Sequence, residues 1–149
     1  VSSTPSSLTW TTTNGEVTIT DCDTDATGEL VIPGTIGGNP VTGIGRAAFY
    51  QCRSLTGITI PDSVTSIGDE AFRNCRSLTS ITIPDSVNSI GEKAFWNCTS
   101  LTAVTFLGDA PEEVGRVFSS KVIIYRKPEA KGWGDTWAGR PVKLISEKP

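Results

Sequence analysis

The segment Leu55–Ser77 reads LTGITIPDSVTSIGDEAFRNCRS, and the segment that follows it, Leu78–Ser100, reads LTSITIPDSVNSIGEKAFWNCTS. The two segments are nearly the same 23 residues written twice. A unit of this length is too small to bury its own apolar side chains, and it buries them only against a neighbouring copy. The period therefore predicts a solenoid, in which successive copies stack as coils.

The same period extends to both sides of the two clean copies. Phenylalanine, cysteine and leucine each recur at the 23-residue interval. The first coil carries an additional Gly/Pro-rich segment, GTIGGNPV (34–41), which we expect to bulge from it as a turn. The last coil is degraded, as terminal repeats usually are. The recurring residues are Phe49, Phe72, Phe95 and Phe118; Cys52, Cys75 and Cys98; and Leu55, Leu78 and Leu101.

Each repeat divides into a strand and a return segment. In residues 58–60, Ile-Thr-Ile, β-branched residues alternate with period two, which favours a strand with the isoleucines inward and the threonine outward. Pro61 ends this strand because it has no N–H group to give to the ladder. Acidic residues followed by Ala-Phe then predict a single helical turn over 69–74, and likewise over 92–97.

These elements predict an α/β solenoid. We expect a right-handed stack of about four coils, with a parallel β-sheet on one face and short strands or single helical turns on the other. We expect Trp133 and Trp137 to close the C-terminal end of the core, and Trp10 to do the same at the start. The expected parts are an N-terminal lead-in and cap at 1–26, repeats at 27–122 (about 27–54, 55–77, 78–100 and 101–122), and a C-terminal capping segment at 123–149.

The repeat unit, L-x-x-I-x-I-P-x-S-V-x-x-I-G-x-x-A-F-x-x-C-x-x, resembles the BspA-like bacterial leucine-rich repeats, also described as the Treponema pallidum type. The resemblance covers roughly residues 27–145. General leucine-rich repeats have Asn or Cys at the ninth position, where this chain has Ser63 and Ser86, and this departure points to the bacterial subtype.

Family members are typically secreted or displayed on the cell surface, and several are adhesins. The resemblance therefore implies a non-catalytic extracellular or cell-surface binding module that recognises a protein or a glycan through its repeat surface. Two alternatives to a binding module stay open. In the first, the chain is a structural spacer in a larger surface protein, and in the second, it is an accessory domain of a secreted enzyme.

Composition and charge exclude several classes of function. The formal net charge of −3 gives no basic field for a nucleic-acid backbone, and the longest apolar runs are far too short to cross a bilayer. Histidine is absent, which excludes imidazole-dependent catalytic triads and histidine-bearing zinc sites. The acids Asp62 and Asp85, like Asp69 and Glu92, recur with the repeat and are assigned to the scaffold. We therefore expect no enzyme activity, no cofactor and no metal site.

Four cysteines in an exported protein would normally be read as two disulfides. Here Cys52, Cys75 and Cys98 occupy one inward site on successive coils, where parallel Cβ vectors suit a disulfide poorly. We expect these three to be free buried thiols. Cys22 is off their register, and its position leaves open whether it pairs or sits in the N-terminal cap.

Two lines of outward residues are candidate ligand sites. One is a threonine ladder on the main sheet, beside a row of small residues that would let an extended partner lie close. The other is a strip formed by the residue after each phenylalanine, in which an arginine lies between two aromatic residues. This composition is typical of binding hot spots, and equally of a surface stack that satisfies itself. The ladder is Thr59, Thr82 and Thr105, and the strip is Tyr50, Arg73 and Trp96.

The N-terminal segment is rich in serine and threonine. We expect residues 1–15, VSSTPSSLTWTTTNG, to be a linker or a weakly ordered lead-in. The chain begins at Val1, has no methionine and carries no apolar leader, so we expect it to be a piece of a larger protein. An exposed parallel edge at the first coil would permit weak self-association unless the N-terminal segment covers it.

Overall fold

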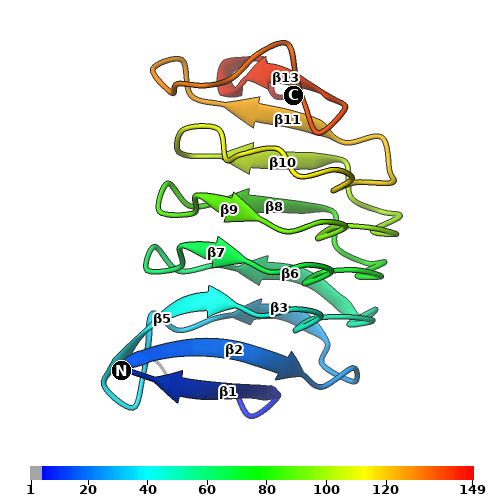
Figure 1. Ribbon diagram of the computed structural model, residues 1–149. Helices are drawn as coiled ribbons and strands as arrows, with labels where there is room; N and C mark the ends of the chain where they lie inside the picture. Colours follow the sequence, from blue (N-terminus) through cyan, green and yellow to red (C-terminus); the bar gives the residue numbers. More distant parts are fainter. Residues whose placement is uncertain (1–4) are drawn as a thin grey trace.

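The computed structural model describes residues 5–149, and residues 1–4 of the expected lead-in lie outside this range. The described chain is a β-solenoid of about five coils with a repeat of about 23 residues (Figure 1). The predicted solenoid is confirmed, and it has about five coils where about four were expected. Its strands are β1 (Leu8–Thr13), β2 (Glu16–Cys22), β3 (Gly28–Val31), β4 (Thr35–Ile36), β5 (Asn39–Ile44), β6 (Leu55–Thr59), β7 (Ser66–Ile67), β8 (Ser80–Ile83), β9 (Ser89–Ile90), β10 (Ala103–Phe106), β11 (Ile123–Arg126), β12 (Thr136–Trp137) and β13 (Arg140–Leu144), followed by the short 3-10 helix η1 (Ile145–Glu147).

The strands form two faces of the stack. One face is a sheet in the order β1-β2-β5-β7-β9, with β4 paired to β5. The other face contains the pair β3-β6 and a separate sheet in the order β12-β13-β11-β10-β8. Most neighbouring strands of successive coils pair in parallel and in the register of the repeat, so that Ser66 lies opposite Ser89 and Ser80 lies opposite Ala103.

The phenylalanines that recur with the repeat lie in single file through the core. Neighbouring ring centroids are 5.1, 5.2 and 5.6 Å apart, and the ring planes are within 16° of each other. Phe49, Phe72 and Phe95 are fully buried, and Phe118 is 7% exposed at the end of the file. Each ring is therefore covered by the ring of the next coil, as the period predicts.

The cysteines of the repeats are buried beside the phenylalanine file, and all four cysteines are free thiols. Cys75 donates its thiol proton to the carbonyl of Phe49 in the preceding coil at 3.2 Å. Cys98 donates to the carbonyl of Phe72 at 3.0 Å. Burial raises the pKa of Cys98 to about 12 and also raises the pKa of Cys75. These thiols therefore stay protonated and act as donors between coils.

The segments predicted to be single helical turns, 69–74 and 92–97, contain no helix. In the first of them Glu70 and Asn74 have φ angles of 57° and 65°, which no right-handed helix accepts. Alternate N–H groups of this segment donate to carbonyls of the next coil at 2.7–3.0 Å. The prediction was wrong because these donors join two coils instead of closing a helix within one.

In the described part of the N-terminal lead-in, the chain from Leu8 onward is an ordered hairpin and not a linker. β1 and β2 pair antiparallel around Asn14 and Gly15, whose φ angles of 52° and 77° suit a tight hairpin turn. β2 then pairs in parallel with β5 and covers the first edge of that sheet. Trp10 does not cap the core and is 37% exposed, because a bulge between Thr9 and Trp10 leaves Leu8 as the buried residue of β1.

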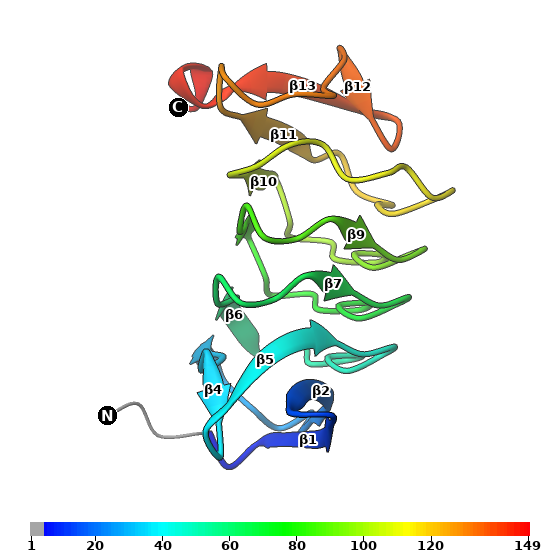
Figure 2. The same cartoon turned by 60° about the vertical axis from the view of Figure 1, so that its left-hand side comes forward.

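Two further hairpins interrupt the stack. Segment 34–41, expected to bulge as a turn, is the hairpin of β4 and β5, with Gly37 and Gly38 at positive φ. The hairpin of β12 and β13 has the same form, with Ala138 and Gly139 at positive φ. Figure 2 shows β4 and β12 near opposite ends of the stack. The expected turn in the first coil is confirmed.

Tryptophans close the C-terminal end of the core, as predicted. Trp137 is 2% exposed, and its ring centroid lies 5.3 Å from that of Phe106 and 6.2 Å from that of Phe118. Its indole N–H donates to the carbonyl of Pro111 at 2.8 Å, so the buried nitrogen is satisfied. Trp133 packs beside it at 6.1 Å. The pair covers the last coil where no further repeat does so.

We expect the substitution Phe72→Ala to lower the free energy of unfolding by about 3–5 kcal/mol, because it opens a cavity in the middle of the file. Urea unfolding measures this value. The matched control is Val31→Ala at a side chain that is 58% exposed, where we expect a change within about 0.5 kcal/mol. A loss below about 1 kcal/mol for Phe72→Ala would show that the file is not the core.

We expect Gly68→Ala to destabilise the stack by about 1–3 kcal/mol through overpacking. A Cβ at Gly68 would lie 2.8 Å from the backbone nitrogen of Arg46 and 2.8 Å from the carbonyl carbon of Gly45, in the preceding coil. Gly34→Ala is the control, because its Cβ would meet its nearest atoms at 3.9 and 4.0 Å. Equal urea midpoints for the two variants would contradict so close an approach of the coils.

Candidate functional site

The face that carries the threonines is interrupted between two neighbouring coils. β6 pairs with β3, and β8 pairs with β10, but within the described residues no backbone ladder joins β6 to β8. On the opposite face the same two coils are joined by the pairing of β7 with β9. We call the gap between β6 and β8 the seam. The two coils are joined by a backbone ladder on one face, and on the other face β6 and β8 lie side by side without one.

A proline explains the missing contact at one end of the seam. In the next pair of coils, Leu107 donates its N–H to the carbonyl of Ile83 at 3.0 Å, just beyond the paired strands. The equivalent residue one repeat earlier is Pro84, which has no N–H to give to the carbonyl of Ile60. The seam therefore lacks a donor that the following pair of coils has.

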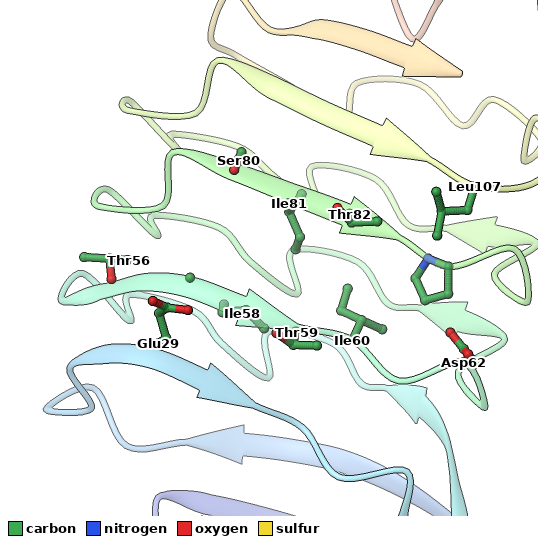
Figure 3. A pocket seen from close by; sticks show the side chains of 12 residues that line it. Glu29, Thr56, Ile58, Thr59, Ile60, Asp62, Ser80, Ile81, Thr82 and Leu107 are labelled. Atoms are coloured by element: carbon green, nitrogen blue, oxygen red, sulfur yellow. The ribbon is translucent and has the colours of Figure 1, made fainter. Parts of the chain in front are cut away.

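A groove with a volume of about 500 Å³ lies over the seam (Figure 3). Its lining includes Thr59 and Thr82, two of the predicted site residues, and both are exposed. Ile58 is 6% exposed and Ile81 is 4% exposed, whereas Val104 in the next strand is fully buried. The groove thus reaches the margin of the core at the seam.

The groove is acidic. Glu29 from β3 and Asp62 after β6 are the charged residues in its lining. Figure 3 shows them toward opposite ends of the groove. Gly57 makes room for the first of them, since a Cβ at Gly57 would lie 3.2 Å from Cγ of Glu29. Two carboxylates beside threonine hydroxyls favour a partner that brings cationic groups and hydrogen-bond donors.

The third residue of the predicted threonine ladder is covered. Thr105 is only 8% exposed, and its Oγ1 accepts a hydrogen bond from Nζ of Lys148 at 3.4 Å. The same ammonium group lies 5.7 Å from the ring centroid of Tyr125. The expectation of an exposed Thr105 was wrong because the C-terminal end of the chain folds over β10 and β11. The ladder is reduced to Thr59 and Thr82, one on each side of the seam.

The strip of Tyr50, Arg73 and Trp96 lies on successive turns, held in register by hydrogen bonds between coils. Arg73 does not stack between the aromatic rings. Its guanidinium pairs with Glu70 and, by this hydrogen bond and its charge, lowers the pKa of that carboxyl group. The ring of Trp96 lies 5.8 Å from the ammonium of Lys93. The cations near the strip are therefore engaged within the chain, whereas the groove has exposed acids.

One recurring acid has a structural role, as predicted for the scaffold. Oδ1 of Asp69 accepts the backbone N–H of Glu92 in the next coil at 2.8 Å. Among residues 5–149, no group of three His, Cys, Asp or Glu side chains is arranged to hold a metal ion. Over the same residues, no helix has the length and apolar character needed to span a bilayer.

Comparison with known proteins supports the family that the repeat unit suggested. The profile of the BspA type leucine rich repeat region matches residues 35–122 in six copies, which is more than half of the chain. The chain belongs to this family. The match confirms the resemblance drawn from the repeat unit. Among curated protein sequences, none is significantly similar to this BspA-type repeat chain.

Solved structures of bacterial leucine-rich repeat proteins share the fold. A leucine-rich repeat protein from Bacteroides capillosus is 30% identical with a TM-score of 0.66, over 84% of this chain and 97% of that chain. The T. pallidum leucine rich repeat protein is 25% identical with a TM-score of 0.66, over 83% and 71%. A leucine rich cell surface protein from Faecalibacterium prausnitzii is 28% identical with a TM-score of 0.56, over 86% and 45%.

Amide hydrogen exchange tests the seam. β10 has a partner strand on each side, whereas β6 and β8 each have one. Alternate amides of a strand point to opposite neighbours, so we expect roughly half of the amides in β6 and β8 to exchange much faster than those of β10. Residue-resolved exchange by NMR measures this difference. Uniform protection of the three strands would show that the seam is closed in solution.

Proposed function

We propose that the chain is a non-catalytic binding module of an extracellular or cell-surface protein, and that it recognises an extended segment of a partner polypeptide at the seam. One observation carries this proposal. Two neighbouring parallel strands, β6 and β8, have unpaired edges toward each other beneath an exposed acidic groove. Unpaired strand edges are templates for the main chain of another polypeptide.

The lining of the groove supports an extended peptide as the occupant. Gly57 and Ser80 are small and let a main chain approach the sheet closely. Free main-chain groups give affinity that depends little on the partner's sequence, and pockets for its side chains give specificity. Glu29 and Asp62 would select a segment that carries Lys or Arg, chiefly by steering it and fixing its orientation.

A protein partner fits these features better than a glycan, because unpaired N–H and C=O groups complement a peptide backbone. The family supports a location outside the cell. The F. prausnitzii relative is described as a cell surface protein, and this chain covers 45% of it. We extend that location to this chain as part of the proposal. A spacer without a ligand of its own is the competing function.

The test is an array of extended peptides that carry Lys, matched with peptides in which Glu replaces Lys. We expect the intact chain to bind Lys-containing peptides at micromolar concentration, and Thr82→Arg to weaken that binding by roughly tenfold or more because it brings a positive charge into the groove. Ser89→Arg is the matched control, since it makes a similar change at an exposed residue of β9 on the paired face. Urea midpoints confirm that both variants fold.

Other outcomes would contradict the binding role, the peptide as ligand or the location of the site. Blank peptide and glycan arrays would favour the spacer. If the chain binds a glycan and Thr82→Arg abolishes that binding, the seam is the binding site but its ligand is not a peptide. If peptide binding persists in Thr82→Arg but is lost in Trp96→Ala, the binding site is the strip on the turns and not the seam.

A further inference from the structure

Cys52 has a different environment from the other cysteines of the repeats. In the inner coils each thiol donates to the carbonyl of a phenylalanine in the preceding coil at 3.0–3.2 Å. Cys52 belongs to the first coil, and no phenylalanine precedes Phe49 in the sequence to supply the same carbonyl from the N-terminal cap. Its thiol instead lies 3.8 Å from the carbonyl oxygens of Cys22 and Asp23. The periodic contact is thus replaced by a contact with the cap.

Cys22 brings a second thiol to the same place. Its sulfur lies 3.7 Å from the carbonyl oxygen of Asp23, so both sulfurs converge on one acceptor. The interaction of each thiol with the other lowers the pKa of Cys22 and, together with burial, raises that of Cys52. Both residues are buried, with Cys22 2% exposed and Cys52 fully covered. Two cysteines from distant parts of the sequence therefore meet where the cap joins the first coil.

We propose that Cys22 and Cys52 are a disulfide-forming pair that closes when the chain folds in the presence of a small-molecule disulfide. The thiolate of Cys22 attacks the oxidant and expels one of its thiolates, which leaves a mixed disulfide at Cys22. The thiolate of Cys52 then attacks the sulfur of Cys22 and expels the second thiolate. Two protein thiols are oxidised, their two protons go to the departing thiolates, and the oxidant is reduced to two thiols.

The geometry distinguishes this pair from the rest. Cys75 and Cys98 follow the period, and each already donates to a carbonyl of the preceding coil. Cys22 comes from the end of β2 and approaches from outside the period, so the parallel arrangement of the repeated cysteines does not constrain it. The bond would close the loop 22–52, which includes β3, β4 and β5. Closing that loop restricts the unfolded chain and ties the cap to the first coil.

The test refolds the reduced, denatured full chain with oxidised glutathione, blocks the remaining thiols and maps the linked peptides by mass spectrometry. We expect one linkage, Cys22 to Cys52, with Cys75 and Cys98 blocked as free thiols. We expect the thermal midpoint of the oxidised chain to exceed that of the reduced chain by about 5–15 °C. Cys22→Ser should remove both the linkage and the difference between midpoints, whereas Cys75→Ser should keep both.

Several results would overturn the proposal. Four blocked thiols after oxidative refolding would show that the pair does not close. A linkage between Cys52 and Cys75, or between two copies of the chain, would show that the contact with the cap does not direct pairing. An equal rise in midpoint for Cys22→Ser would show that oxidation acts elsewhere.

Discussion

The structure depends on the covering of each phenylalanine by the phenylalanine of the next coil. No ring of the inner coils is enclosed by its own repeat, and the file from Phe49 to Phe118 is continuous at 5.1–5.6 Å. This spacing forces the backbones together elsewhere, so that Gly68 has no room for a side chain. It also explains the turns with positive φ, whose N–H groups reach the next coil instead of closing a helix. The stability of each coil therefore depends on its contacts with the neighbouring coils.

The sequence was most informative where the period alone decides the structure. Strand residues 58–60, the phenylalanine file and the inward cysteines could be predicted because a repeated side chain must occupy a repeated position. The helical turns were predicted wrongly because acids before Ala-Phe suit a helix locally, and the competing hydrogen bonds come from a coil 23 residues away. The N-terminal hairpin was missed although Asn14-Gly15 is a strong local signal for one, since the serine and threonine content outweighed it.

The candidate site was predictable only in part. The period places Thr59 and Thr82 on one outward face, and the structure adds the groove between them. The covering of Thr105 by Lys148 involves residues 43 positions apart, and no repeat pattern encodes such a contact. The seam is a similar case. Pro61, one repeat before Pro84, was predicted to end a strand, but the effect of Pro84 on pairing is seen only by comparison with Leu107, which one coil later supplies the donor that Pro84 lacks.

The seam and the N-terminal cap are linked by the topology of the sheets. One wall of the seam, β6, belongs to a sheet of only two strands, and its partner β3 has no further strand beyond it in the described chain. A two-stranded sheet is marginal without packing support. That support comes from the core beneath it, which the cap completes through Val17 and Ile19. Holding the cap on the first coil therefore also holds the weaker wall of the groove, so a bond between Cys22 and Cys52 would act on the binding face from the other side of the core.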